Sequence, residues 1–112
     1  MKTSVFAFAL AFLLAAPFII TSPARADHDA AHAFTEAHKN MMQSMEGMKL
    51  TGDADKDFAM MMIPHHQGAI TMAEIELKYG KDPDLRKMAE EMIAAQKKEI
   101  EELKKWQQEH AM

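Results

Sequence analysis

The chain has 112 residues, with 13 Lys and Arg against 17 Asp and Glu, and it contains no cysteine. Its net charge of −4 argues against nucleic acid as a partner, because binding to phosphate needs clustered basic residues. Without cysteine the protein has neither a disulfide to constrain a short chain nor a thiolate to bind a metal. Its stability must therefore come from packing, a bound metal or self-association.

The first residues are typical of a secretory signal peptide. Lys2 precedes an apolar run over residues 5–20, and Ala24-Arg25-Ala26 follows as an A-x-A cleavage site. The run is shorter than the roughly 20 residues that a membrane-spanning helix needs, which disfavours an uncleaved anchor. We expect a signal peptide at 1–26 and an exported domain at 27–112 that does not contact the membrane after cleavage.

Methionine dominates the large apolar residues of this mature domain. Residues 27–112 contain 11 Met, against 4 Leu, 5 Ile, 2 Phe and no Val. Met is flexible and specifies a packed core poorly, so selection for stability alone would favour Leu at many of these positions. We expect methionine and alanine to fill the core, and we expect some of the methionines to have a chemical role.

The pattern predicts three helices and no strand, and therefore an all-α protein that forms a small antiparallel helical bundle. The first helix is expected from about Ala30 to Met48. The second runs from a cap at Asp53 or Asp55 to Tyr79. The third opens with Asp82 as N-cap and Pro83 in its first turn, and reaches about Gln108.

The second helix has only a narrow polar line, made by Gln67, Thr71, Glu74 and Lys78. The rest of its circumference is largely apolar, so it must be covered on more than one side. Three helices of one chain leave part of that surface open. The pattern therefore favours a homodimer, or a four-helix arrangement completed by a partner chain.

The candidate chemistry lies within this apolar surface. Met61 and His65 are four residues apart, as are Met62 and His66, so each thioether is expected beside an imidazole, and Met72 lies on the line of His65. Burying an unpaired imidazole costs on the order of 1–3 kcal/mol, and a bound metal removes that cost. The first helix adds ligand-type side chains at helical spacing, namely His38, Met41, Met45 and Met48.

Two residues beside the histidines should shape the site. Pro64 is expected to kink the helix or to start a new one, and Gly68 allows another helix or an ion to come close. From the third helix, Gln96 and Glu99 are expected to hydrogen-bond the buried imidazoles.

Thioether and imidazole ligands favour copper(I), with silver(I) as its surrogate. Magnesium and calcium need oxygen clusters, zinc would be expected with Cys or H-E-x-x-H, and a di-iron bundle needs Glu-x-x-His repeats. Plain core packing is the alternative for the methionines. His28 and His32, together with His38, form either a weak accessory site for copper(II) or zinc or no site at all.

These residues resemble the CopM-like copper metallochaperones, catalogued as domain of unknown function 305. The resemblance rests on Asp57-Phe58 leading into Met62-Ile63-Pro64-His65-His66-Gln67-Gly68-Ala69-Ile70 and Met72-Ala73, then Gly80-Lys81-Asp82-Pro83-Asp84-Leu85-Arg86, then Ala94-Ala95-Gln96 with Glu99-Ile100. It implies a ferritin-like bundle, a periplasmic location, and binding of Cu(I) and Ag(I) for copper tolerance or delivery. The implied ligands are Met61, Met62, His65, His66 and Met72, and by extension Met41, Met45 and Met48.

The chain departs from this family at one place. Where relatives often carry a methionine after Gln-x-x-Glu-Ile, this sequence has Glu101, Glu102 and Leu103, so a ligand from the third helix is missing. The number and affinity of sites are therefore open, whereas the fold is not affected.

We expect a non-catalytic protein that sequesters Cu(I) or exchanges it with a donor or acceptor protein. A copper oxidoreductase is a second class, although the sequence offers no convincing base, nucleophile or substrate pocket. A third class is a metal-free, Met-rich module that binds apolar helices or reacts with oxidants to form methionine sulfoxide.

Overall fold

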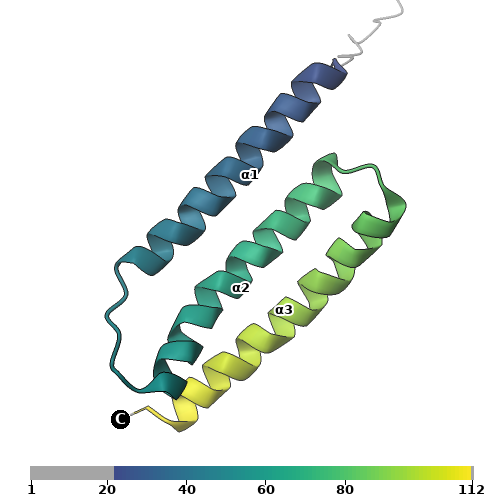
Figure 1. Ribbon diagram of the computed structural model, residues 1–112. Helices are drawn as coiled ribbons and strands as arrows, with labels where there is room; N and C mark the ends of the chain where they lie inside the picture. Colours follow the sequence, from purple (N-terminus) through teal and green to yellow (C-terminus); the bar gives the residue numbers. More distant parts are fainter. Residues whose placement is uncertain (1–21, 112) are drawn as a thin grey trace, which may run out of the picture.

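The computed structural model describes residues 22–111, and within them the chain forms three α-helices and no strand. These are α1 (Pro23–Glu46), α2 (Ala54–Tyr79) and α3 (Pro83–Glu109), which run up and down beside one another (Figure 1). The predicted all-α bundle is confirmed. No helix among the described residues is long and apolar enough to cross a membrane. The predicted signal peptide lies mostly outside these residues, since 1–21 are not described.

The boundaries of α2 and α3 follow the predicted caps. The Asp53 carboxylate accepts a hydrogen bond from the backbone N–H of Lys56, and the Asp82 carboxylate accepts from the N–H groups of Asp84 and Leu85. Each bond satisfies donors that the first turn of a helix leaves free. Pro83 occupies the first turn of α3, where a missing N–H costs nothing.

The predicted start of the first helix is wrong, because α1 begins at Pro23 rather than Ala30 and ends at Glu46. Proline at the first helical position is preorganised for a helix, and the residues that follow are rich in alanine, the best helix former. The helix therefore extends through the predicted cleavage point after Ala26.

A hydrogen-bonded turn joins α1 to α2. The Asp57 carboxylate accepts from the backbone N–H and hydroxyl of Thr51, both at 2.8 Å, and from the N–H of Gly52 at 3.0 Å. These bonds, above all the one from the Thr51 N–H, hold the pKa of Asp57 below its usual range. Gly52 has φ +88°, a conformation that favours glycine.

Helix α2 lies between the other two helices. It packs against both α1 and α3, whereas α1 and α3 do not contact each other along the described chain. The buried apolar side chains of the core are nearly all small, and Ile100 is the exception. The small ones are Ala37, Ala59, Ala73 and Ala89. Such side chains let helices approach closely, so the predicted role of alanine in the core is confirmed.

The expectation that methionine shares the core is only partly met. No described methionine is fully buried: seven are half-buried (Met41, Met45, Met48, Met60, Met61, Met62 and Met72) and three are exposed (Met42, Met88 and Met92). Because alanine occupies most of the buried helix contacts, the methionines other than Met41 stand at the margins of the core. Their side chains are consequently accessible to solvent and to small solutes.

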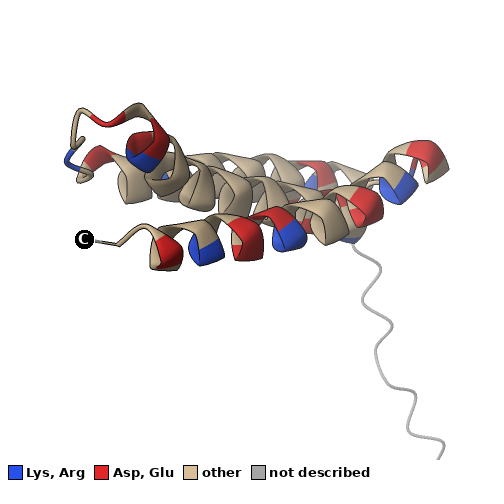
Figure 2. Cartoon of the chain, turned by 90° about the horizontal axis from the view of Figure 1, so that it is seen from below, with Lys and Arg blue, Asp and Glu red and all other residues tan. Residues whose placement is uncertain are grey.

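Charge and apolar surface are unevenly divided over the molecule. Acidic and basic residues alternate along α3, whereas residues 58–73 of α2 carry neither (Figure 2). Several large apolar side chains are exposed, among them Phe58 on α2, which is 62% exposed, and Leu85, Met88 and Met92 on α3. The predicted covering of this surface by a partner chain stays a prediction.

Candidate metal centre

Two grooves flank α2, one toward each neighbouring helix, and they divide the predicted site residues between them. The groove toward α1 has a volume of about 180 Å³ and is lined by Ala37, Asn40, Met41, Ser44, Pro64, Gln67, Gly68 and Thr71. Met41 is its one sulfur-bearing side chain. Predicted ligands Met45, on α1, and Met48, in the loop that follows α1, are half-buried but do not line this groove.

Gly68 permits the close packing of α1 on α2. A Cβ atom at Gly68 would lie 2.5 Å from Sδ and 3.1 Å from Cβ of Met41, so the methionine occupies the space that a side chain would fill. The prediction that another helix comes close at Gly68 is confirmed. Pro64, one turn earlier, is buried within a continuous helix, so the alternative that a new helix starts there is wrong.

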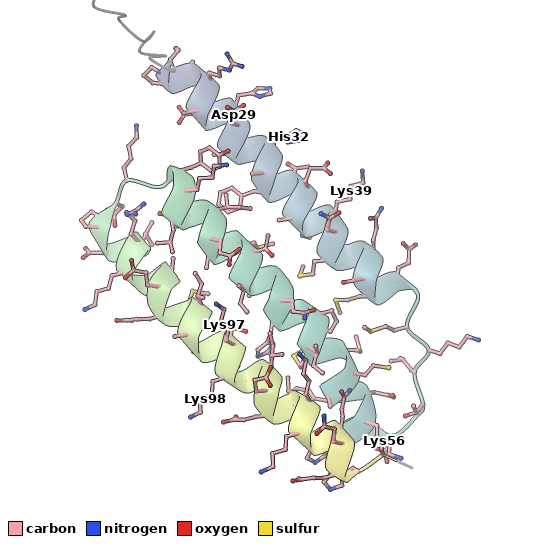
Figure 3. All side chains as sticks on the ribbon, turned by 180° about the vertical axis from the view of Figure 1, so that it is seen from behind. Asp29, His32, Lys39, Lys56, Lys97 and Lys98 are labelled. Carbon is pink, nitrogen blue, oxygen red and sulfur yellow. The ribbon has the colours of Figure 1, made fainter. Side chains whose placement is uncertain are left out.

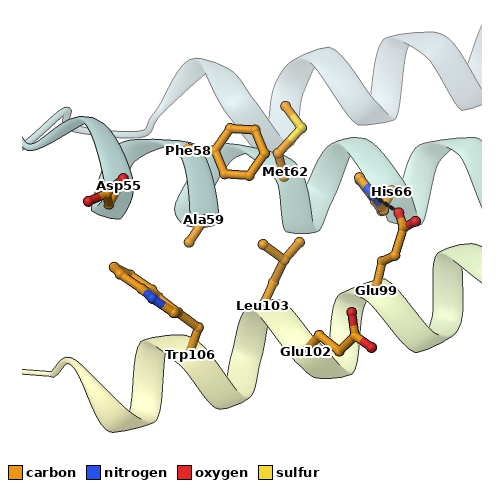
Figure 4. Close-up of a pocket in the computed structure, with 9 residues that line it drawn as sticks. All are labelled: Asp55, Phe58, Ala59, Met62, His66, Glu99, Glu102, Leu103 and Trp106. Atoms are coloured by element: carbon orange, nitrogen blue, oxygen red, sulfur yellow. Dashed lines mark hydrogen bonds and ion pairs between the residues drawn. The ribbon is translucent and has the colours of Figure 1, made fainter.

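The groove toward α3 is larger, about 390 Å³, and it carries most of the site chemistry (Figure 4). Its predicted ligands are Met62 and His66, both from α2. Glu99 and Glu102 face them from α3, together with Leu103 and Trp106. Phe58, Ala59 and Asp55 complete the lining. This groove therefore combines a thioether, an imidazole and carboxylates over an apolar floor.

Glu99 binds His66 across the two helices. The Nε2 atom of His66 lies 2.5 Å from Oε2 of Glu99, with the His66 side chain 15% exposed and the Glu99 side chain 53% exposed. The predicted hydrogen bond from Glu99 to a buried imidazole is thereby confirmed. Metal-binding histidines commonly make such a bond with their second ring nitrogen.

Two buried polar atoms beside this pair have no hydrogen-bond partner among the described residues. They are Nδ1 of His66 and Oε1 of Gln96. The predicted hydrogen bond from Gln96 to an imidazole is thus not made by its carbonyl oxygen. Buried polar atoms are nearly always paired, so each of these two atoms is an exception among the described residues.

The two adjacent histidines have different environments. His65 is exposed and His66 is nearly buried, with their ring centroids 6.3 Å apart and the ring planes at 61°. The expectation that both imidazoles are buried is therefore wrong for His65. Consecutive helical residues point about 100° apart, so only His66 is directed into the contact with α3.

The remaining predicted ligands are spread along α1 and α2. Met61 and Met72 are half-buried on α2, whereas His38 is exposed on α1. Figure 3 shows most of the sulfur atoms gathered between the halves of α1 and α2 nearest their connecting loop. In residues 22–111 no three His, Cys, Asp or Glu side chains gather closely enough to hold an ion by themselves.

Trp106 and Phe58 are groove residues that the sequence reasoning did not identify. The spacing of Trp106 contains a usable signal, since it lies seven residues after Glu99 and hence on the same side of α3. Phe58 carries a comparable signal, since it lies four residues before Met62 and eight before His66, on the same side of α2.

Comparison with known proteins places this three-helix chain in a family. The model described as "Domain of unknown function (DUF305)" matches residues 15–107, so the chain belongs to this family. An uncharacterized protein of Acanthamoeba polyphaga mimivirus is 41% identical over 49 residues, which cover 44% of this chain. The matched segment spans about a third (32%) of that relative's length, and the similarity reveals no activity.

Proposed function

We propose that this protein binds copper(I), and silver(I) as its surrogate, through Met and His side chains of α2 and α1. In this role it is exported to the periplasm and sequesters copper or exchanges it with another protein, without catalysis. The carrying observation is the groove between α2 and α3, where Met62 lies with a nearly buried His66 whose Nδ1 atom has no hydrogen-bond partner within residues 22–111.

The donor set of this groove fits a soft ion. Thioether sulfur and neutral imidazole are ligands that suit Cu(I), and neither is lost to disulfide formation in an oxidising compartment. In this groove the ion would be held by His66 and Met62, whereas the half-buried Met61 and Met72 lie on the line of His65. His65, exposed one residue before, supplies a second imidazole at the surface.

Partial exposure of the ligands supports a role in transfer. The half-buried methionines other than Met41 stand at the margins of the helix contacts rather than inside a sealed core, so a bound ion can be approached by a second protein. The resemblance to copper metallochaperones supports the same role. We extend this to residues 1–26, which we propose are a signal peptide that directs the chain to the periplasm.

The decisive experiment is an anaerobic titration of the protein with Cu(I) against a competing chromophoric chelator. We expect saturable, stoichiometric binding that outcompetes the probe, and its loss or strong weakening in the double variant His65→Ala plus His66→Ala. His110→Ala is a matched control, because His110 is exposed at the C-terminal end of α3 and does not line the groove of Met62 and His66.

A second candidate takes over if no ion binds. The exposed side chains of Met88 and Met92 on α3 would suit a metal-free module that contacts apolar helices or consumes oxidants as methionine sulfoxide. Full helicity in the double variant, together with unchanged Cu(I) binding, would reject the histidine site. Circular dichroism of each variant separates a lost site from a lost fold.

A further inference from the structure

The bond between Glu99 and His66 determines which ring nitrogen of the histidine is free. Nε2 of His66 meets Oε2 of Glu99 at 2.5 Å, while Nδ1 is buried and has no partner among the described residues. In a neutral imidazole one nitrogen carries the proton and the other carries a lone pair. The two possible tautomers are therefore not equivalent in this groove.

Only one tautomer satisfies the contacts that are present. With the proton on Nε2, the ring donates to the carboxylate and keeps a lone pair on Nδ1. With the proton on Nδ1, a bare Nε2 would face the oxygen of Glu99, and a buried N–H would have no acceptor. The carboxylate thus selects the ring with its proton on Nε2.

We propose that Glu99 is a positioning residue: it fixes His66 as the Nε2–H tautomer, so that Nδ1 is the atom that binds the soft ion. The second half of this statement rests on the proposed copper function, whereas the tautomer is a property of the metal-free protein. The unpaired Oε1 of Gln96, one turn before Glu99, is a second buried acceptor on the same helix.

Glu102 provides an internal comparison for this role. It lines the same groove as Glu99 but pairs with Lys98 at 3.8 Å on the surface of α3. Its substitution removes a carboxylate from the groove without removing the bond to His66. If the carboxylates acted only through their charge, substitution of either one would change the tautomer of His66 and the binding of the ion. If Glu99 positions the ring, only substitution of Glu99 changes them.

The tautomer can be measured by ¹H–¹⁵N correlation spectroscopy of the protein with ¹⁵N-labelled histidine and no metal. We expect His66 to show the Nε2–H pattern in the wild type and in Glu102→Ala. In Glu99→Ala we expect the ring shifts to move from the pure Nε2–H pattern toward those of a mixture of tautomers, because the hydrogen bond that holds the proton on Nε2 is lost. Glu99→Gln should restore the wild-type pattern, since its amide oxygen can accept the same hydrogen bond.

Silver(I) is the probe that tests whether Nδ1 of His66 binds the soft ion, because silver(I) is diamagnetic. On adding Ag(I) we expect the Nδ1 resonance of His66 to move strongly while Nε2 stays protonated. Glu99→Ala should weaken Ag(I) binding about 10- to 100-fold, as removal of outer-shell partners does elsewhere, with Glu102→Ala unchanged. Circular dichroism is recorded for each variant, so that a folding defect is recognised.

Two results would overturn the proposal. An Nδ1–H ring in the metal-free wild type, or identical ring shifts in wild type and Glu99→Ala, would reject the role of Glu99. A silver-induced shift at Nε2 instead of Nδ1 would reject the assigned donor atom. Absence of any Ag(I) and Cu(I) binding would reject the copper function itself, and the tautomer measurement would still decide the role of Glu99 separately.

Discussion

Met41 of α1 lies directly on Gly68 of α2, close enough that a Cβ atom at Gly68 would be 2.5 Å from its sulfur. The clash also involves Cβ of Met41, at 3.1 Å, which cannot move without its backbone. This contact fixes how closely α1 approaches α2. It is the reason why the helix that carries the histidines tolerates a glycine in its interior, where glycine normally costs about 1 kcal/mol.

We predict that Gly68→Ala destabilises the protein despite the better helix propensity of alanine. Overpacking costs about 1–3 kcal/mol, of which about 1 kcal/mol is offset by propensity, so a net loss of up to about 2 kcal/mol is expected. Urea unfolding measures it. Adding Met41→Ala should recover most of the loss, and Gly47→Ala, which meets no atom within 4 Å, should be neutral. Equal stability of Gly68→Ala and wild type would contradict the contact.

The turn before α2 predicts a dependence of stability on acid. Hydrogen bonds from Thr51 and Gly52 hold the pKa of Asp57 below its usual range, so the folded protein binds this proton less readily than the unfolded chain. The carboxylate therefore contributes stability above its unfolded pKa, near 3.9, and the contribution is lost as the pH falls through the folded pKa.

Asp57→Asn should accordingly lower the melting temperature at neutral pH and flatten its fall below about pH 4. Thermal unfolding followed by circular dichroism at a series of pH values tests this. Asp55→Asn is the matched control, because Asp55 is in the same turn of α2 but makes no hydrogen bond to Thr51 or Gly52. Parallel pH profiles for wild type and Asp57→Asn would refute the prediction.

Local signals predicted the ends of α2 and α3, since Asp53, Asp82 and Pro83 act through bonds within a few residues. The start of α1 was misjudged because no side-chain cap marks it: Ser22 makes no capping bond, and the helix begins at Pro23 with an alanine-rich turn. Helical spacing also predicted the contact of Glu99 with an imidazole. It did not predict which imidazole.

The sequence alone could not predict that His65 and His66 have different environments, and the reason is physical. Periodicity fixes the angle between two side chains on one helix, but it does not state which side a neighbouring helix covers. That depends on α3 packing against His66 and leaving His65 exposed. The same reasoning explains the methionines, which periodicity assigned to the core and which alanine excludes from it.

Hydrogen bonds from Arg86 of α3 to the end of α2 lead to a third prediction. Nη1 of Arg86, in α3, donates to the carbonyl oxygens of Leu77 at 2.7 Å and Gly80 at 3.0 Å. These oxygens lie at the C-terminal end of α2, where carbonyl groups lack helical partners and the dipole is negative. Arg86 thus fastens the connection that brings His66 opposite Glu99.

Arg86→Ala should lower the free energy of unfolding by about 1–2 kcal/mol, the range for charge-assisted hydrogen bonds that are partly exposed to solvent. Lys87→Ala is its control, because Lys87 makes only an exposed pair with Glu91 at 3.9 Å, and such pairs contribute about 0–1 kcal/mol. Chemical unfolding compares the two. If both variants lose the same free energy of unfolding, the hydrogen bonds of Arg86 have no special role.

The last prediction concerns which methionines serve the metal, and it depends on the proposed function. Leucine replaces methionine with little change in volume, at a cost usually below about 1.5 kcal/mol, but it removes the sulfur. Met62 shares a groove with His66, whereas Met41 lines the opposite groove, which contains no histidine. Met62→Leu should therefore weaken Cu(I) binding by about tenfold or more, the scale seen when groups around a metal site are removed.

Met41→Leu should affect Cu(I) affinity much less than Met62→Leu, and Met88→Leu, at an exposed position on α3, should not affect it. Competition with a chromophoric chelator gives the three affinities. Trp106, the single tryptophan, lines the groove of Met62, so its fluorescence should also respond to the ion in wild type and respond less in Met62→Leu. Equal losses in Met41→Leu and Met62→Leu would instead indicate a site shared across α2, because only an ion that both helices contact would require both sulfurs.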